Sequence, residues 1–394
     1  LTPTESRALK AVAVQFFVNG AVVASYVPRL PSIRDNLDVD LATIGIVMAA
    51  ASGFGVFGSF VQGPIIGRIG TRSAMIGGAL LLVIMLPFVS LVNSVALLLL
   101  VLGALSISDV VTDVAMNMQG SVLSARRDAP VMNRLHAMWS LGTVVGGVMA
   151  ALMATLDVDL RLHLLGASLV LASTLLYVAP GLLPNDSPNP AGRPARKPGK
   201  APGVAVTFAA LGAAAIIPEM INSDWAAFRL SDDLGESEGL AGAAYVAFTA
   251  GMLVARFAGD ALVHRLGGAV VLRRATLLAA AGTLLATTIP SSLTVFAGLF
   301  IAGLGVSVMF PQLYDAAARH ERPARALGGL TAGTRIALLI TPLVVGFLAN
   351  TDAFTVGAAI AVTVIPAALL VWWLSRRLAS SEPDAGSVPT SNEV

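Results

Sequence analysis

Three polar side chains stand in one row within an apolar stretch of the chain. Asp109, Asp113 and Asn117 are spaced four residues apart, so in an α-helix they share one face. Ionising a carboxylate in apolar surroundings costs several kcal/mol. Each aspartate therefore either pairs with a group such as Arg134 or His136, or stays protonated and can carry a proton. We expect Asp109 and Asp113 to couple protons and Asn117 to contact a solute; structural pairing is the alternative.

A second acidic position is Glu219, which directly follows Pro218. A proline inside a helix bends it and frees a backbone carbonyl. We expect Glu219 to be a third proton-coupling carboxyl, and Asn222 and Trp225 just beyond it to contact the solute. The structural alternative is that Glu219 bonds across to a neighbouring helix.

Neutral amides and one arginine complete the expected solute site. Gln15 and Asn19 lie on one helical face, where amides either bind solute hydroxyls or hold helices together. His136 belongs to the same solute-binding set. Arg335 has no acid nearby in sequence, so its partner is either on another helix or an anionic solute. The aromatic rings of Trp139, Trp225 and Tyr245 are candidates to stack on a sugar ring.

Helices embedded in lipid must position these groups. Of 394 residues, 56% are hydrophobic and 12% charged, and the mean hydropathy is +0.81, far outside the range of soluble domains. A span needs about 20 apolar residues. We expect twelve spans, the first retained rather than cleaved, at residues 9–31, 41–66, 74–92, 95–118, 133–156, 160–181, 206–230, 239–263, 269–289, 293–314, 326–349 and 354–375.

The charges alternate between the loops that join these spans. Most lysines and arginines fall in one set of loops, and the other set is acidic, with Asp35, Asp38, Asp40, Asp157, Asp159, Asp232, Asp233, Glu236, Glu238 and Asp352. The positive-inside rule then places both termini in the cytoplasm.

The chain divides near its middle at a polar, basic, proline-rich stretch, residues 184–200. Such a composition is typical of a linker. We expect one six-helix bundle over residues 1–182, a cytoplasmic linker over 183–205, a second bundle over 206–378 and a disordered cytoplasmic tail over 379–394.

Short motifs recur on both sides of this linker. Residues 63–70 have a counterpart in residues 260–267, and the pair Gly142 and Gly146 matches Pro342 and Gly346. The offset is about half the chain, which indicates two pseudo-symmetric six-helix bundles. Glycines four residues apart predict close helix packing.

At this point the sequence resembles the Major Facilitator Superfamily over essentially its whole length. The family signature between the second and third helices is matched by Gly63, Ile65, Ile66, Gly67, Arg68, Gly70 and Arg72, with Gly67 where the family usually carries an aspartate. The resemblance implies a gating role for Arg68 and Arg72. Arg256 and Asp260, four residues apart in the second copy, predict an ion pair that extends to the inner gate.

Two further motifs look like those of a bacterial inner-membrane branch related to fucose–proton symporters. The first is Asp109, Asp113 and Asn117, and the second is Met132, His136, Ser140 and Gly142. The resemblance implies alternating access with the solute between the halves, and a monomer. Its expected function is secondary transport of a small sugar-like or polyol-like solute across the inner membrane, as a proton-coupled symporter; sodium in place of the proton stays open. The alternative is a proton-coupled efflux antiporter of a metabolite or amphiphile.

Enzymes are the class that the sequence favours least. The chain has no cysteine, and we find no nucleophile-and-base set, Walker phosphate loop or metal-binding histidine cluster. We therefore expect no cofactor, no metal and no nucleic-acid partner, only the solute, protons and the lipid bilayer.

Overall fold

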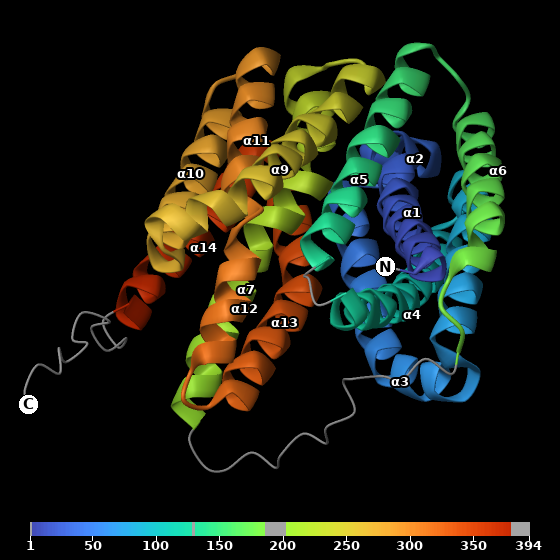
Figure 1. The fold of residues 1–394 in the computed structure, drawn as a ribbon. Coiled ribbons are helices and arrows are strands. Elements are labelled where there is room, and N and C mark those ends of the chain that lie inside the picture. Colours follow the sequence, from blue (N-terminus) through green and yellow to red (C-terminus); the bar gives the residue numbers. More distant parts are fainter. Residues whose placement is uncertain (1, 128–130, 186–201, 380–394) are drawn as a thin grey trace, which may run out of the picture.

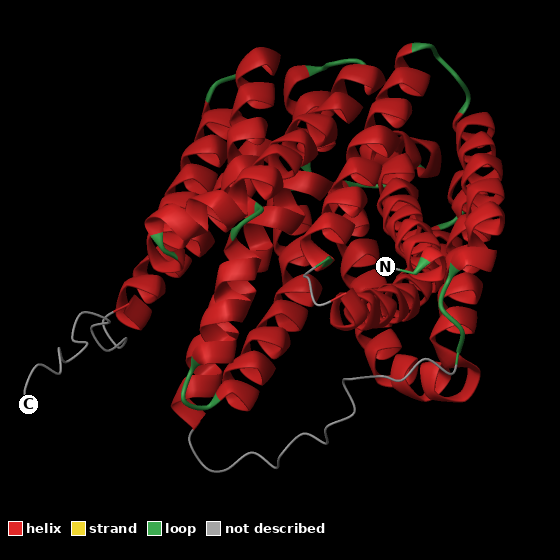
Figure 2. Cartoon of the chain, in the orientation of Figure 1, coloured by secondary structure: helices red, strands yellow, loops and turns green. Residues whose placement is uncertain are grey.

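The computed structural model describes residues 2–127, 131–185 and 202–379, apart from the side chains of Pro3, Arg127, Asn133, Pro202, Asp260 and residues 377–379. Within these residues every regular element is helical (Figures 1 and 2). Most of the expected linker and the tail beyond residue 379 lie outside the described residues.

The N-terminal half contains the first nine elements: α1 (Pro3–Tyr26), η1 (Val27–Arg29), α2 (Leu30–Leu37), α3 (Leu41–Met85), η2 (Leu86–Ser90), α4 (Val95–Arg127), α5 (Met132–Thr155), α6 (Leu160–Val178) and η3 (Ala179–Gly181). The C-terminal half contains the other nine: α7 (Pro202–Asp224), α8 (Ala226–Phe228), the π-helical turn η4 (Arg229–Asp233), α9 (Glu238–Leu266), α10 (Gly268–Thr288), α11 (Ser292–Val306), α12 (Met309–Arg319), α13 (Pro323–Ala349) and α14 (Val356–Ala379).

Eleven apolar helical stretches in the described residues are long enough to cross a membrane. The second covers Leu41–Ser90 and is 50 residues long, which is enough for two spans. It turns at Gly70 inside α3, so it contains the two expected spans at 41–66 and 74–92. The expected all-α fold of twelve membrane helices is confirmed.

The turn in α3 recurs half a chain later. Gly70 has φ 82° and ψ 163°, and Gly267, between α9 and α10, has φ 81° and ψ 146°. Only glycine adopts such angles without strain. The two repeats therefore share a backbone conformation as well as a sequence motif.

Two expected spans are interrupted. The expected helix at 293–314 stops at Val306 and restarts at Met309, because the ring of Pro311 clashes with the carbonyl four residues earlier, that of Ser307. The expected helix at 206–230 stops at Asp224, and the chain turns through α8 and η4.

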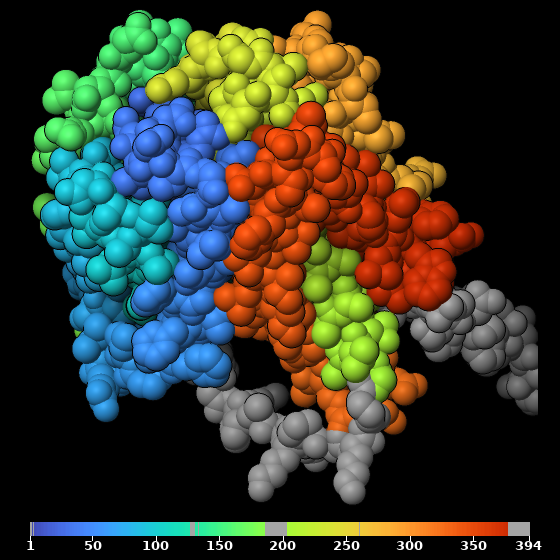
Figure 3. All heavy atoms as spheres, turned by 180° about the vertical axis from the view of Figure 1, so that it is seen from behind, coloured from blue at the N-terminus to red at the C-terminus, as the bar shows by residue number. Residues whose placement is uncertain are grey.

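Among the described residues, one apolar cluster joins the two halves, at one end of the molecule. One cluster combines Val18 and Ile44 with Trp225, Tyr245 and Val345. The other two clusters each stay within one half. We call the joined end the closed end; it carries α2 and the loop at 350–355. The opposite linker end carries η3 and the start of α7, and there a gap separates the halves in Figure 3.

Candidate functional site

Close backbone contacts join the halves at the closed end. A Cβ atom on Gly45 of α3 would lie 2.5 Å from the Pro342 carbonyl oxygen and 3.1 Å from the Gly346 Cα of α13. Gly346 thus packs across the halves, whereas Gly146, its counterpart in the repeat, packs on Ala21 and Ala24 of α1 within its own half. Both motifs pack closely, as expected, but on different neighbours.

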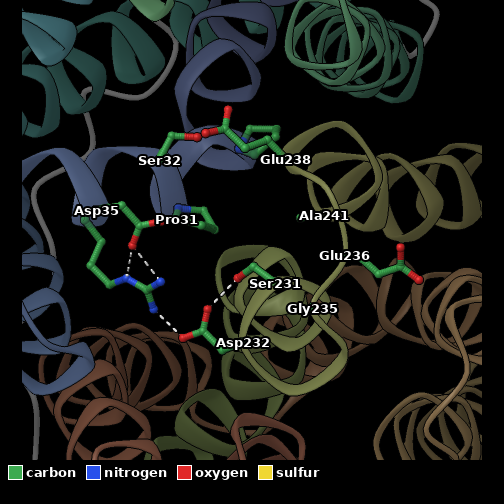
Figure 4. A pocket seen from close by; sticks show the side chains of 11 residues that line it. Pro31, Ser32, Asp35, Ser231, Asp232, Gly235, Glu236, Glu238 and Ala241 are labelled. Atoms are coloured by element: carbon green, nitrogen blue, oxygen red, sulfur yellow. Dashed lines mark hydrogen bonds and ion pairs between the residues drawn. The ribbon is translucent and has the colours of Figure 1, made fainter. Parts of the chain in front are cut away.

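Ion pairs reinforce this closure around a pocket of about 220 Å³ (Figure 4). Arg34 of α2 donates to Asp232 of η4 and to Asp35. Arg29 pairs with Glu238 at 3.2 Å. Arg34–Asp232 and Arg29–Glu238 both cross between the halves, so they must break if this end opens.

A hydrogen-bonded chain runs between three helices in the middle of the molecule. Asn19 of α1 donates through Nδ2 to Asp109 Oδ1 of α4 at 2.8 Å. Trp139 Nε1 of α5 donates to Asn19 Oδ1 at 2.9 Å. The guanidinium of Arg256, on α9 of the other half, lies 5.4 Å from the Trp139 ring centroid and donates to the Ser140 hydroxyl. The chain therefore links Asp109 to the C-terminal half.

Asp109 and Asp113 both line a cavity of about 370 Å³ between the halves. Asn117 Nδ2 donates to Asp113 Oδ1 at 2.9 Å, so two residues of the expected row bond to each other, whereas Asp109 bonds to Asn19 of α1. Neither carboxylate makes an ion pair with a described side chain. The opposite wall includes Arg335 of α13 and Tyr314 of α12.

Two arginines of the C-terminal half reach serines of the N-terminal half. Arg335 donates to Ser59 of α3, and Arg256 donates to Ser140 of α5. The side chain of Asp260, the expected partner of Arg256, lies outside the described residues. Sequence reasoning missed both serines. The repeat offered a signal for Ser59. Ser59 lies eleven residues before Gly70, and Arg256 lies eleven residues before Gly267, so the two residues occupy equivalent positions in the two halves.

Two further expected residues lie near Arg256. Glu219 of α7 is half-buried and close enough to Arg256 to interact electrostatically. His136 packs edge-to-face on Phe16, with ring centroids 5.2 Å apart, and also interacts with Arg256.

Of the expected solute-binding residues, Arg335 is in the described lining of the cavity, whereas the others are not: Gln15, Asn19, Asn117, His136, Asn222 and Trp225. Trp225 is fully buried against Phe228 at the turn after α7. Asn222 is buried and donates to the Thr283 hydroxyl at 3.0 Å. Gln15 is also buried. Trp225, Asn222 and Gln15 are therefore packed inside the protein in this conformation and do not line the cavity.

The two basic residues of the family signature lie at the linker end. Arg68 is exposed. Arg72 donates to the Ala179 carbonyl at 3.2 Å, within the N-terminal half. Neither contacts the other half among the described residues.

Comparison with known proteins agrees with this architecture. An uncharacterised MFS-type transporter of Yersinia pestis is 27% identical over 351 residues, 86% of this chain and 88% of the relative. Membrane protein MosC of Rhizobium meliloti is 24% identical over 389 residues, 97% of this chain and 94% of the relative.

Solved structures share the fold. The nucleoside transporter NupG has a TM-score of 0.70 at 14% identity and covers 95% of this chain and 98% of its own. FucP in the outward conformation has a TM-score of 0.62 at 15% identity and covers 94% and 98%. The profile of the Major Facilitator Superfamily matches residues 12–230 and 203–391. The chain belongs to the Major Facilitator Superfamily of membrane transporters.

Proposed function

We propose that this transporter is a proton-coupled symporter for a small polar, sugar-like or polyol-like solute in the bacterial inner membrane. The linker end, which carries the basic linker, then faces the cytoplasm together with both termini. In that orientation the structure is open towards the cytoplasm and closed towards the outside.

The main support for this proposal is the hydrogen-bond partner of Asp109. Its hydrogen bond comes from the neutral amide of Asn19, and that of Asp113 comes from Asn117. A fixed arginine or lysine would neutralise the carboxylate permanently, whereas an amide leaves its charge uncompensated. Protonation removes that charge, so each aspartate suits a cycle of proton binding and release.

The inter-half contacts supply the second requirement, a switch of access. The close contact of Gly45 with Pro342 and the ion pairs of Arg29 and Arg34 all lie at the closed end. Arg335 and Arg256 contact the opposite half deeper in the bundle, beside the carboxylates. Opening at the closed end would bring Asp109 into contact with the outer solution.

Transport in proteoliposomes tests the proposal. Uptake from a panel of sugars and polyols should rise with an inward proton gradient, and an internal pH dye should report solute-evoked acidification. Asp109→Asn should abolish the dependence on the gradient while solute exchange persists. Asp315→Asn removes an exposed carboxylate that pairs with Arg319 on α12, so it is the matched control and should transport normally.

Uptake that ignores both the proton gradient and Asp109→Asn would reject the mechanism. Uptake that is driven by an inward sodium gradient instead would identify sodium as the coupling ion. Displacement of binding by hydrophobic cations, in place of sugars or polyols, would favour efflux.

A further inference from the structure

The cavity of about 370 Å³ has an asymmetric charge distribution. Its N-terminal wall carries Asp109 and Asp113, and its C-terminal wall carries Arg335. Arg335 is the one basic residue in its described lining. With both carboxyls protonated, Arg335 leaves the lining positive; with both ionised, the lining is negative.

Arg335 is half-buried and has no carboxylate partner among the described residues, unlike the two buried arginines Arg29 and Arg229. Arg29 pairs with Glu238 and Arg229 pairs with Asp233 at 2.6 Å. A guanidinium has five N–H donors, and the described contact of Arg335 is with the Ser59 hydroxyl. The remaining donors are suited to a planar anion such as a carboxylate.

Hydroxyl-bearing residues line the same cavity as this arginine. The cavity lining also includes Ser52 of α3, Ser106 of α4, and Thr331 and Thr334 of α13. Hydroxyls donate and accept, so they suit a solute with several hydroxyls of its own. A volume of about 370 Å³ lies within the range of small-molecule sites.

We propose that the solute is a hydroxylated monocarboxylic acid whose carboxylate binds Arg335 and which enters together with protons on the aspartates. This inference rests on the proposed symport and names its substrate class. A dianion such as a phosphate monoester fits less well, since its second charge would face Asp109 and Asp113.

Charge coupling between the two walls explains why an anion and protons would travel together. Asp109 and Asp113 of α4 line the same cavity as Arg335 of α13 and Tyr314 of α12. Tyr26 of α1 also interacts with Asp109. Tyrosines remain neutral over the physiological range. Bound anion therefore favours protonation of the aspartates, and protonation favours the anion, by reciprocal linkage.

A single introduced thiol can measure this charge selectivity without a known substrate, because the chain has no cysteine of its own. Ser106→Cys places the thiol in the cavity wall. The purified full chain is treated with two methanethiosulfonate reagents of similar size, one with a sulfonate and one with a trimethylammonium group. The ratio of the anionic to the cationic reaction rate is divided by the same ratio for a free thiol in solution.

At a low pH, where both aspartates are protonated, we expect this normalised ratio to exceed one, and at a higher pH we expect it to fall as the aspartates ionise. Arg335→Gln should lower the ratio at the lower pH about tenfold or more, because the reagents respond to the lost charge in opposite directions. Arg335→Lys should keep the ratio, and it provides a second variant if Arg335→Gln does not fold. Arg319→Gln, which removes an exposed arginine of α12, is the matched control.

A ratio below one at the lower pH, or one that Arg335→Gln leaves unchanged, would overturn the anionic solute. Those outcomes leave the symport proposal intact as long as Asp109→Asn still abolishes proton dependence in proteoliposomes. Conversely, an anion-selective cavity with proton-independent uptake would reject the coupling alone.

Discussion

Gly45→Ala should shift the transporter away from the closed-end conformation. The new Cβ would meet backbone atoms, with the Pro342 carbonyl oxygen at 2.5 Å and the Gly346 Cα at 3.1 Å. Backbone atoms cannot rotate away as a side chain can. Overpacking of this kind costs about 1–3 kcal/mol, and the cost disappears once α3 and α13 separate. The ratio of closed to open molecules should therefore fall by about 5- to 150-fold.

Gly53→Ala is the matched control on the same helix. Its Cβ would lie 3.6 Å from Leu339 Cδ2, the end of a flexible side chain on α13. The two substitutions share the gain in helix propensity, which is about 1 kcal/mol, so this term cancels between them. Only the clash at Gly45 distinguishes the variants.

Distance measurements between spin labels report the shift. Cysteines at Asn36 and Asp352, both exposed at the closed end on opposite halves, can be labelled selectively because the chain lacks native cysteine. Pulsed dipolar spectroscopy should show a larger long-distance population for Gly45→Ala than for the parent or Gly53→Ala. Identical distributions in both glycine variants would refute the reasoning.

Three further variants test other parts of the structure. Gly70→Ala should lower the free energy of unfolding by about 1–2 kcal/mol because Gly70 has a positive φ. Gly67→Ala, whose Cβ would meet open space, should not lower it. Equal melting temperatures of the two variants would contradict this prediction. The carboxylate of Asp40 accepts from Thr43 N at the start of α3, which lowers its pKa; its stabilisation is fully present above the ordinary value of 3.8 and is lost as the pH falls below it. Asp40→Asn should accordingly flatten the acid side of a stability–pH profile. Arg29→Gln, which removes the ion pair with Glu238, should raise the open population in the same spin-label assay, and an unchanged population would show that this pair is dispensable.

The membrane spans could be predicted from sequence because hydropathy is a local property. The limits of that approach appear at Pro311, whose ring breaks a helix that remains apolar throughout. They appear again at Trp225, which the chain places at a buried turn after Asp224 instead of on a cavity-facing helix. Hydropathy does not distinguish a buried turn from a helix that continues.

The site was predictable as a set of residue types but not as a set of partners. Helical spacing alone predicts that Asp109, Asp113 and Asn117 share one face. The same spacing allows the hydrogen bond from Asn117 to Asp113 to be predicted, because the two residues are one helical turn apart. The bond from Asn19 to Asp109 joins residues 90 positions apart. That from Arg335 to Ser59 joins residues 276 apart, and it depends on how two bundles meet. Only tertiary packing determines such pairs.

The apolar cluster shared by the halves should make the equilibrium between the closed and open forms depend on temperature. Opening the closed end would hydrate side chains such as Val18, Ile44 and Val345, and hydration of apolar groups carries a positive heat-capacity change. The closed form should then lose population on cooling, and a plot of the logarithm of the equilibrium constant against inverse temperature should curve. A protein closed by salt bridges alone would give a nearly straight line.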